Sequence, residues 1–129
     1  MHTVYVVEDD AQVRLVVARF LEHPELSVTT FASAEEAARA LEEAPPDVAL
    51  VDVSLPLASG VDLHQFIQDM APGTKILLMS GHGPEFLSHQ GLQPGTPFIQ
   101  KPFTREDVRR AVLALAGQGS AEDLPRFSG

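Results

Sequence analysis

Five side chains that can do chemistry stand at the ends of short apolar runs in four separate parts of the sequence. Glu8 and Asp9 follow TVYVV, Asp52 ends ALVD, Ser80 ends KILLMS, and Lys101 follows FIQ. Carboxylates that lie close together raise each other's pKa unless a cation compensates their charge. Oxygen ligands in a chain without cysteine favour Mg²⁺ over Zn²⁺. If the fold brings the three acids together, they form a candidate magnesium site.

The same set of residues suits the transfer of a phosphoryl group. Bound Mg²⁺ usually keeps several waters and takes one or two carboxylates together with a phosphate oxygen. A carboxylate such as Asp52 is an established nucleophile for phosphoryl groups. Lys101 would supply positive charge, and Ser80 a hydrogen-bond donor, to the oxygens of the transferring group. These residues therefore predict phosphoryl chemistry at a magnesium-bound aspartate.

Alternating strands and helices would bring these side chains together. The strands are unbroken apolar runs, as expected for a parallel sheet that is covered on both faces. We predict strands over 3–7, 26–31, 45–52, 74–80 and 96–101, and helices over 11–22, 33–44, 60–70 and 104–117. Ligands bind outside the carboxyl ends of the strands in such sheets. The acids, the serine and the lysine should therefore converge on one edge of an α/β sheet.

Helix start signals support this assignment, while one segment lacks helical periodicity. Ser33 with Glu36, and Thr104 with Asp107, have capping-box spacing. Asp10 is expected to cap the first helix and not to bind metal. In the first helix, the apolar face is predicted to consist of Val13, Val16, Val17 and Phe20. The segment between the fourth and fifth strands is rich in glycine and proline, so its helix should be short or degraded.

Composition narrows the class of protein. The chain has 129 residues, no cysteine and a net charge of −9. The acidic balance disfavours binding of this domain to nucleic acid or to an anionic membrane. No apolar run approaches the roughly 18 residues of a membrane span. We therefore expect a single cytoplasmic domain.

Four motifs together resemble the receiver domains of bacterial two-component response regulators. They are VVEDD (6–10), LVDVSLPLASG (50–60), LLMSGHG (77–83) and FIQKPF (98–103). The resemblance implies a (βα)5 flavodoxin-like three-layer sandwich with a five-stranded parallel sheet. It also implies a receiver domain over residues 1–117. The residues that follow, 118–129, are polar and small, so we expect a flexible tail or linker there.

The resemblance assigns roles in a Mg²⁺-dependent phosphorylation. Asp52 would be the phosphoacceptor and also a metal ligand. Asp9 would bind the metal directly, Glu8 would help to hold it, and the backbone carbonyl of Ser54 would be a further ligand. The domain would catalyse only its own phosphorylation and dephosphorylation, without turning over a diffusible metabolite.

Further roles follow from the same resemblance. Ser80 and Lys101 would contact the phosphoryl group, and Ser80 and Phe98 would change position as a switch. The peptide bond between Lys101 and Pro102 is expected to be cis. Ser54 and His82 would tune the rate of hydrolysis, because they follow the acceptor and the conserved serine by two residues.

The implied partner is a histidine kinase or a histidine phosphotransfer protein. We expect docking on the first helix, with Leu15 outside its buried stripe, and on Pro102 and Phe103. The segment GLQPGTPFIQKPF is similar to receivers of hybrid sensor histidine kinases. The domain itself is expected to be a monomer or a weak dimer.

The sequence leaves three alternative functions open. A flavodoxin-like cofactor binder would need a loop rich in Ser, Thr and Gly where this chain has three acids. A Mg²⁺-dependent phosphatase with an Asp nucleophile typically carries a second Asp two residues later, where this chain has Ser54. A receiver-fold scaffold would regulate a partner without being phosphorylated.

Overall fold

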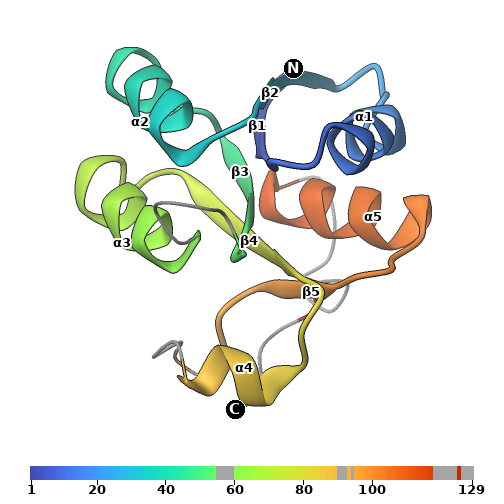
Figure 1. The fold of residues 1–129 in the computed structure, drawn as a ribbon. Helices are drawn as coiled ribbons and strands as arrows, with labels where there is room; N and C mark the ends of the chain where they lie inside the picture. The colour runs from blue at the N-terminus through green and yellow to red at the C-terminus, as the bar shows by residue number, and fades with distance from the viewer. Residues whose placement is uncertain (55–59, 90–92, 94, 118–124, 126–129) are drawn as a thin grey trace.

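The computed structural model describes residues 1–54, 60–89, 93, 95–117 and 125, and these form one parallel sheet flanked by helices (Figure 1). The sheet has five strands in the order β2-β1-β3-β4-β5. The strands are β1 (His2–Val7), β2 (Leu26–Phe31), β3 (Val48–Asp52), β4 (Lys75–Ser80) and β5 (Phe98–Gln100). The helices are α1 (Ala11–Phe20), α2 (Ala34–Glu43), α3 (Gly60–Met70), α4 (Pro84–His89) and α5 (Arg105–Leu115). The predicted (βα)5 fold and its parallel sheet are confirmed.

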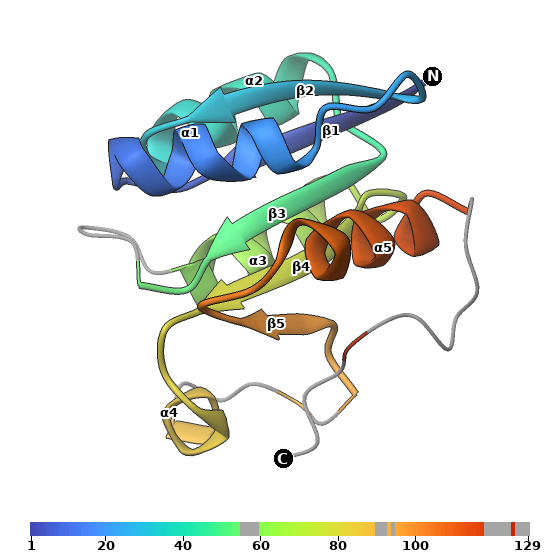
Figure 2. The same cartoon turned by 90° about the vertical axis from the view of Figure 1, so that its right-hand side faces the viewer.

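Two helices cover each face of the sheet, which produces three layers (Figures 1 and 2). Helices α1 and α5 lie on one face, and α2 and α3 lie on the other. Strand β3 shows how the sequence fills both layers. Its residues Val48 and Leu50 pack beneath α1 and α5, while Ala49 and Val51 pack beneath α2 and α3. Because β3 is buried on both faces, its sequence is a continuous apolar run.

The predicted N-caps of α1 and α5 are confirmed. The Asp10 carboxylate accepts hydrogen bonds from the backbone N–H groups of Gln12 and Val13, at 2.9 and 3.1 Å. Thr104 and Asp107 form a reciprocal capping box. These bonds satisfy backbone donors that have no partner within the helix. They therefore fix where the chain leaves the sheet edge and enters each helix.

The cap of α2 differs from a capping box in one bond. The Ser33 hydroxyl accepts a hydrogen bond from the Glu36 N–H at 3.2 Å, as predicted. The Glu36 carboxylate accepts from the N–H of Ala32, at 3.1 Å, where a capping box would use the N–H of Ser33. The helix therefore begins where it was predicted, with the return bond shifted by one residue.

Three of the four residues predicted for the apolar face of α1, Val13, Val17 and Phe20, pack against the core, whereas Val16 does not. Val17 is buried, but Val16 is 45% exposed and Leu21, just after the helix, is fully buried. Val13, Val17 and Leu21 recur every four residues, so they form a stripe that faces the sheet. Val16 lies outside this stripe, so the prediction that it belongs to the buried face was wrong.

Among the described residues between β4 and β5, the one helix is short, as predicted. Helix α4 has six residues and lies beyond β5, off the edge of the sheet (Figures 1 and 2). Of the predicted tail over 118–129, only Pro125 is described, and its carbonyl accepts a hydrogen bond from the N–H of Phe98 at 3.1 Å. The rest of that prediction lies outside the described residues. Among the helices that are described, none is long and apolar enough to cross a membrane.

Candidate functional site

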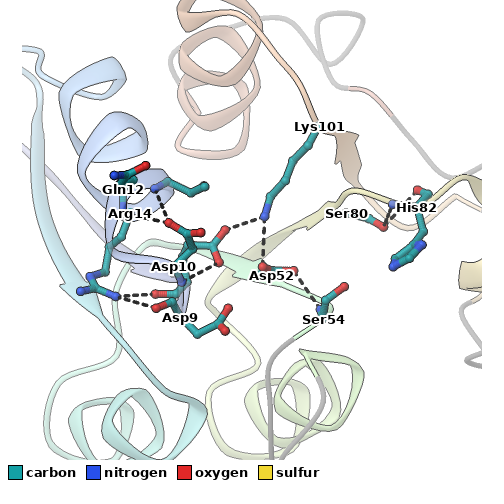
Figure 3. A network of polar contacts seen from close by, with 11 residues as sticks. Asp9, Asp10, Gln12, Arg14, Asp52, Ser54, Ser80, His82 and Lys101 are labelled. Atoms are coloured by element: carbon teal, nitrogen blue, oxygen red, sulfur yellow. Dashed lines mark hydrogen bonds and ion pairs between the residues drawn. The ribbon is translucent and has the colours of Figure 1, made fainter.

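The carboxyl ends of three strands meet at a buried ion-pair cluster (Figure 3). The Lys101 ammonium lies 2.6 Å from a Glu8 carboxylate oxygen and 3.0 Å from an Asp52 carboxylate oxygen. Glu8 is 1% exposed and Asp52 is 3% exposed. Because parallel strands end at the same edge, Lys101 contacts residues that are 49 and 93 positions earlier in the chain. The lysine holds two buried carboxylates that would otherwise repel each other.

A third acid completes a candidate metal site. Glu8, Asp9 and Asp52 each offer a carboxylate oxygen, and these oxygens lie within 4.8 Å of one another. Asp9 is exposed, whereas the other two acids are buried. The site is therefore open on one side and walled by oxygen ligands on the other. Such a donor set fits a hard divalent cation that keeps part of its water shell, as Mg²⁺ does.

The electrostatics of Glu8 reflect opposing influences. Burial raises the pKa of Glu8, and the neighbouring Asp52 carboxylate adds to this effect. The Lys101 ammonium acts in the opposite direction, and the resulting pKa is about 7. Burial alone would lower the pKa of Lys101, but its bonds to both acids raise it above its ordinary value. The lysine therefore stays charged, while Glu8 is poised to exchange a proton near neutral pH.

The chain leaves β3 in a tethered turn. One Asp52 carboxylate oxygen accepts a hydrogen bond from the N–H of Ser54 at 2.8 Å, and the other faces Lys101. The N–H of Val53 donates to the carbonyl of Met79 in β4 at 3.0 Å, so pairing with β4 continues past the end of β3. Asp52 therefore has a fixed orientation at the sheet edge.

Ser80 is placed at the same edge, but its hydroxyl is bonded to the following loop. It accepts a hydrogen bond from the N–H of His82 at 2.9 Å and donates one to the His82 carbonyl at 3.0 Å. The Ser80 backbone carbonyl accepts from the N–H of Lys101 at 2.7 Å. Ser80 therefore positions the lysine through its backbone, while its side chain holds the His82 loop (Figure 3).

The residues around β5 follow the expected arrangement. The peptide bond between Lys101 and Pro102 is cis. Phe98 is 9% exposed, pairs in register with Leu78 of β4, and belongs to the core on the α2 and α3 side. The predicted switch aromatic is thus a core residue at the edge strand.

Sequence reasoning did not identify Arg14, which lies in α1. Its Nη1 atom donates hydrogen bonds to the backbone carbonyls of Glu8 and Asp9, at 2.8 and 3.3 Å. A cation five positions after Asp9, one turn into a helix that follows three acids, is the signal that could have pointed to it. Arg14 ties the loop that carries two of the candidate metal ligands to α1.

A groove of about 370 Å³ lies beside the cluster, between α1 and the segment that joins β5 to α5. Its lining includes Val16, Phe20, Pro102 and Phe103. Leu15 is 53% exposed, as predicted, but it does not line this groove, where Val16 does. The surface proposed for docking is therefore apolar and lies next to Lys101, with Val16 as an additional member.

Comparison with known proteins agrees with this geometry. The family model described as "Response regulator receiver domain" matches residues 4–113. The DNA-binding transcriptional regulator NtrC of Escherichia coli is 33% identical, over 95% of this chain and 26% of that protein. The chain spans 26% of the length of this NtrC and 30% of the length of the regulatory protein DctD of Rhizobium meliloti.

Two solved structures have the same architecture. The receiver domain of the response regulator NarL from Mycobacterium tuberculosis has a TM-score of 0.80 and 27% identity, with 90% of this chain and 96% of that chain covered. The receiver domain of the sensor histidine kinase PA1611 from Pseudomonas aeruginosa has a TM-score of 0.77 and 23% identity, with 90% and 98% covered. The second likeness concerns the fold alone.

Proposed function

The chain belongs to the family of response regulator receiver domains, signalling modules of two-component systems, and from that premise we propose that Asp52 is its phosphoacceptor. One observation carries the proposal above all others. A buried Asp52 shares the Lys101 ammonium with Glu8, and the exposed Asp9 stands beside them. Stability alone gives no reason to bury several like charges at one sheet edge. A cation-dependent reaction with an anionic group does give one.

Glu8, Asp9 and Asp52 would hold Mg²⁺, together with the backbone carbonyl of Ser54. The metal would neutralise carboxylate charge, so that an anionic phosphoryl group can approach. An Asp52 carboxylate oxygen then attacks phosphorus, the bond from phosphorus to the partner's imidazole nitrogen breaks, and the imidazole leaves with that electron pair. Lys101, already 3.0 Å from the Asp52 carboxylate, would stabilise the phosphoryl oxygens. Hydrolysis of the acyl phosphate by water would reset the domain.

Phosphorylation would be read out through Ser80 and Phe98. The Ser80 hydroxyl must exchange its bonds with the His82 backbone for one with a phosphoryl oxygen, so the loop after β4 would be released. Phe98 in β5 pairs with Leu78, two residues before Ser80 in β4, and would repack when Ser80 moves. His82 and Ser54 flank the path that we assign to the attacking water, and they would influence the lifetime of the phosphoryl group.

The phosphodonor would be a histidine kinase or a histidine phosphotransfer protein that presents a helix to the groove beside α1. The apolar side chains of Val16, Pro102 and Phe103 suit a helix with an apolar stripe. Leu15 would contact the same partner from the exposed side of α1. We further propose that the chain resembles receivers of hybrid kinases and acts as a monomer or weak dimer.

The experiment is phosphorylation with acetyl phosphate and Mg²⁺, read by intact mass, with beryllium fluoride binding as a second readout. Wild type should gain one phosphoryl group, and Asp52→Asn should gain none. Asp47→Asn is the matched control, because Asp47 immediately precedes the same strand at its other end. Modification that persists in Asp52→Asn, or no modification of wild type by either reagent, would remove Asp52 from this role.

A further inference from the structure

Arg14 occupies an unfavourable place for a cation. It is the fourth residue of α1, where the partial positive charge of the helix N-terminus favours acids instead. Its guanidinium nevertheless lies against the loop before the helix and donates to the carbonyls of Glu8 and Asp9, at 2.8 and 3.3 Å (Figure 3). Hydrogen bonds from a charged donor are stronger than neutral ones, so they can offset this cost. The hydrogen bonds to these two carbonyls therefore explain why an arginine occupies this position in α1.

The loop between β1 and α1 carries three successive acids, and two of their side chains are already tied. A Glu8 carboxylate oxygen accepts from the N–H of Asp10 at 3.3 Å, and the other contacts Lys101. The Asp10 carboxylate caps α1 through Gln12 and Val13. These two side chains are therefore constrained by their own partners.

Asp9 differs from its neighbours. Within the part of the chain that the structure describes, the exposed Asp9 carboxylate accepts no hydrogen bond, and its direction depends on the backbone that carries it. Arg14 bonds to the carbonyl of Asp9 and to the carbonyl just before it, so it fixes both peptide planes that flank the Asp9 Cα atom. Loss of these bonds would let that backbone rotate and would move the carboxylate away from Glu8 and Asp52.

We propose that Arg14 is a positioning residue that holds the Asp9 backbone so that its carboxylate meets a divalent cation with Glu8 and Asp52. The proposal rests on the function proposed above, in which these acids bind Mg²⁺. Two effects of Arg14 oppose each other. Its charge repels a cation, but water and salt screen that repulsion at a partly exposed site. Mg²⁺ demands near-ideal ligand geometry, so the positioning effect outweighs the repulsion.

The test is a Mg²⁺ titration of the full chain without any phosphodonor. The backbone amide signals of Asp9 and Asp10 in NMR spectra report the binding. Arg14→Gln should weaken Mg²⁺ binding by about tenfold, a loss typical of residues that orient metal ligands. Arg14→Lys should recover part of that loss, because an ammonium can still donate to a carbonyl but lacks the planar fork of arginine. Arg19→Gln is the control, since it removes an exposed charge from the last turn of the same helix.

The melting temperature of each variant separates positioning from general loss of structure. A weaker Mg²⁺ affinity with an unchanged melting temperature supports the proposal. Equal or tighter binding by Arg14→Gln overturns it, and so does an Arg19→Gln effect of the same size. If Arg14→Gln does not fold, wild-type affinity in Arg14→Lys overturns it equally. Failure of wild type to bind Mg²⁺ would instead overturn the proposed function, so the two failures are distinguishable.

Discussion

Two aspartates bracket β3, and they lie in opposite surroundings. Asp47 precedes the strand with a side chain that is 54% exposed, whereas Asp52 ends it with a side chain that is 4% exposed. The Asp47 carboxylate accepts hydrogen bonds from the N–H and the hydroxyl of Thr3, at 2.9 and 3.3 Å. Asp52 instead shares an ammonium group with a second buried acid.

The difference separates a structural acid from a functional one. The bonds from Thr3 satisfy Asp47 at the solvent boundary, and they fasten the start of β3 to β1. Nothing in this arrangement requires a desolvated charge. At the other end of β3, Asp52 is kept buried beside Glu8, which costs free energy unless a cation compensates it. Among the described residues, the buried carboxylates therefore lie at the edge where we propose the phosphoryl chemistry.

Of the changes that test this difference between Asp47 and Asp52, removal of the Lys101 ammonium group should have the largest effect. Lys101→Met leaves Glu8 and Asp52 buried together, so we expect the free energy of unfolding without Mg²⁺ to fall by about 3 kcal/mol near pH 8. Lys75→Met is the control, because Lys75 is an exposed lysine at the amino end of β4 and should cost no more than about 0.5 kcal/mol. Urea unfolding measures both. Equal stability of the two variants would mean that the lysine does not hold the acids.

The second test uses the proton on Glu8. Its pKa of about 7 means that a metal must displace a proton at lower pH, so Mg²⁺ affinity should rise about tenfold between about pH 6 and pH 8 and then level off. In the metal-free protein the sign is opposite. A raised carboxyl pKa makes the folded state bind the proton more tightly, so stability should fall as pH rises from the ordinary value of 4.5 to about 7.

Glu8→Gln provides the check on this pH dependence. Mg²⁺ titrations of the variant should give an affinity that is nearly independent of pH in the same range, although it is weaker than that of wild type at high pH. A variant that keeps the full wild-type pH profile would assign the titrating proton to another group.

Local chemistry explains which parts of the fold were predictable. The continuous apolar runs of β3 and β4 predicted buried strands, and Thr104 predicted the start of α5, because these signals act over a few residues. The exposure of Val16 was not predictable in the same way. It depends on how α1 is rotated against the sheet, which tertiary packing decides through residues such as Leu21.

The candidate site shows the same division. The location of Glu8, Asp52 and Lys101 at the ends of predicted strands indicated that they would meet. Topology alone brings the ends of parallel strands to one edge. The bonds of Arg14 to two carbonyls, and of the Ser80 hydroxyl to the His82 backbone, depend on side-chain conformations within folded loops. Residue type and spacing do not specify these conformations.

The smallest expected effects come from comparing Asp52→Asn with Asp47→Asn. These are isosteric changes of the two aspartates that bracket β3. Asp52→Asn removes one of three carboxylates that lie within 4.8 Å and leaves Lys101 paired with Glu8, so it should raise the metal-free stability by about 1 kcal/mol near pH 8. Asp47→Asn replaces a charged acceptor for Thr3 with a weaker neutral one, and it should lower stability by about 0.5 kcal/mol. Urea unfolding at the same pH measures both changes. Opposite signs mean that the chain gives up stability at Asp52, whereas stability lost in both variants would mean that Asp52, too, stabilises the fold.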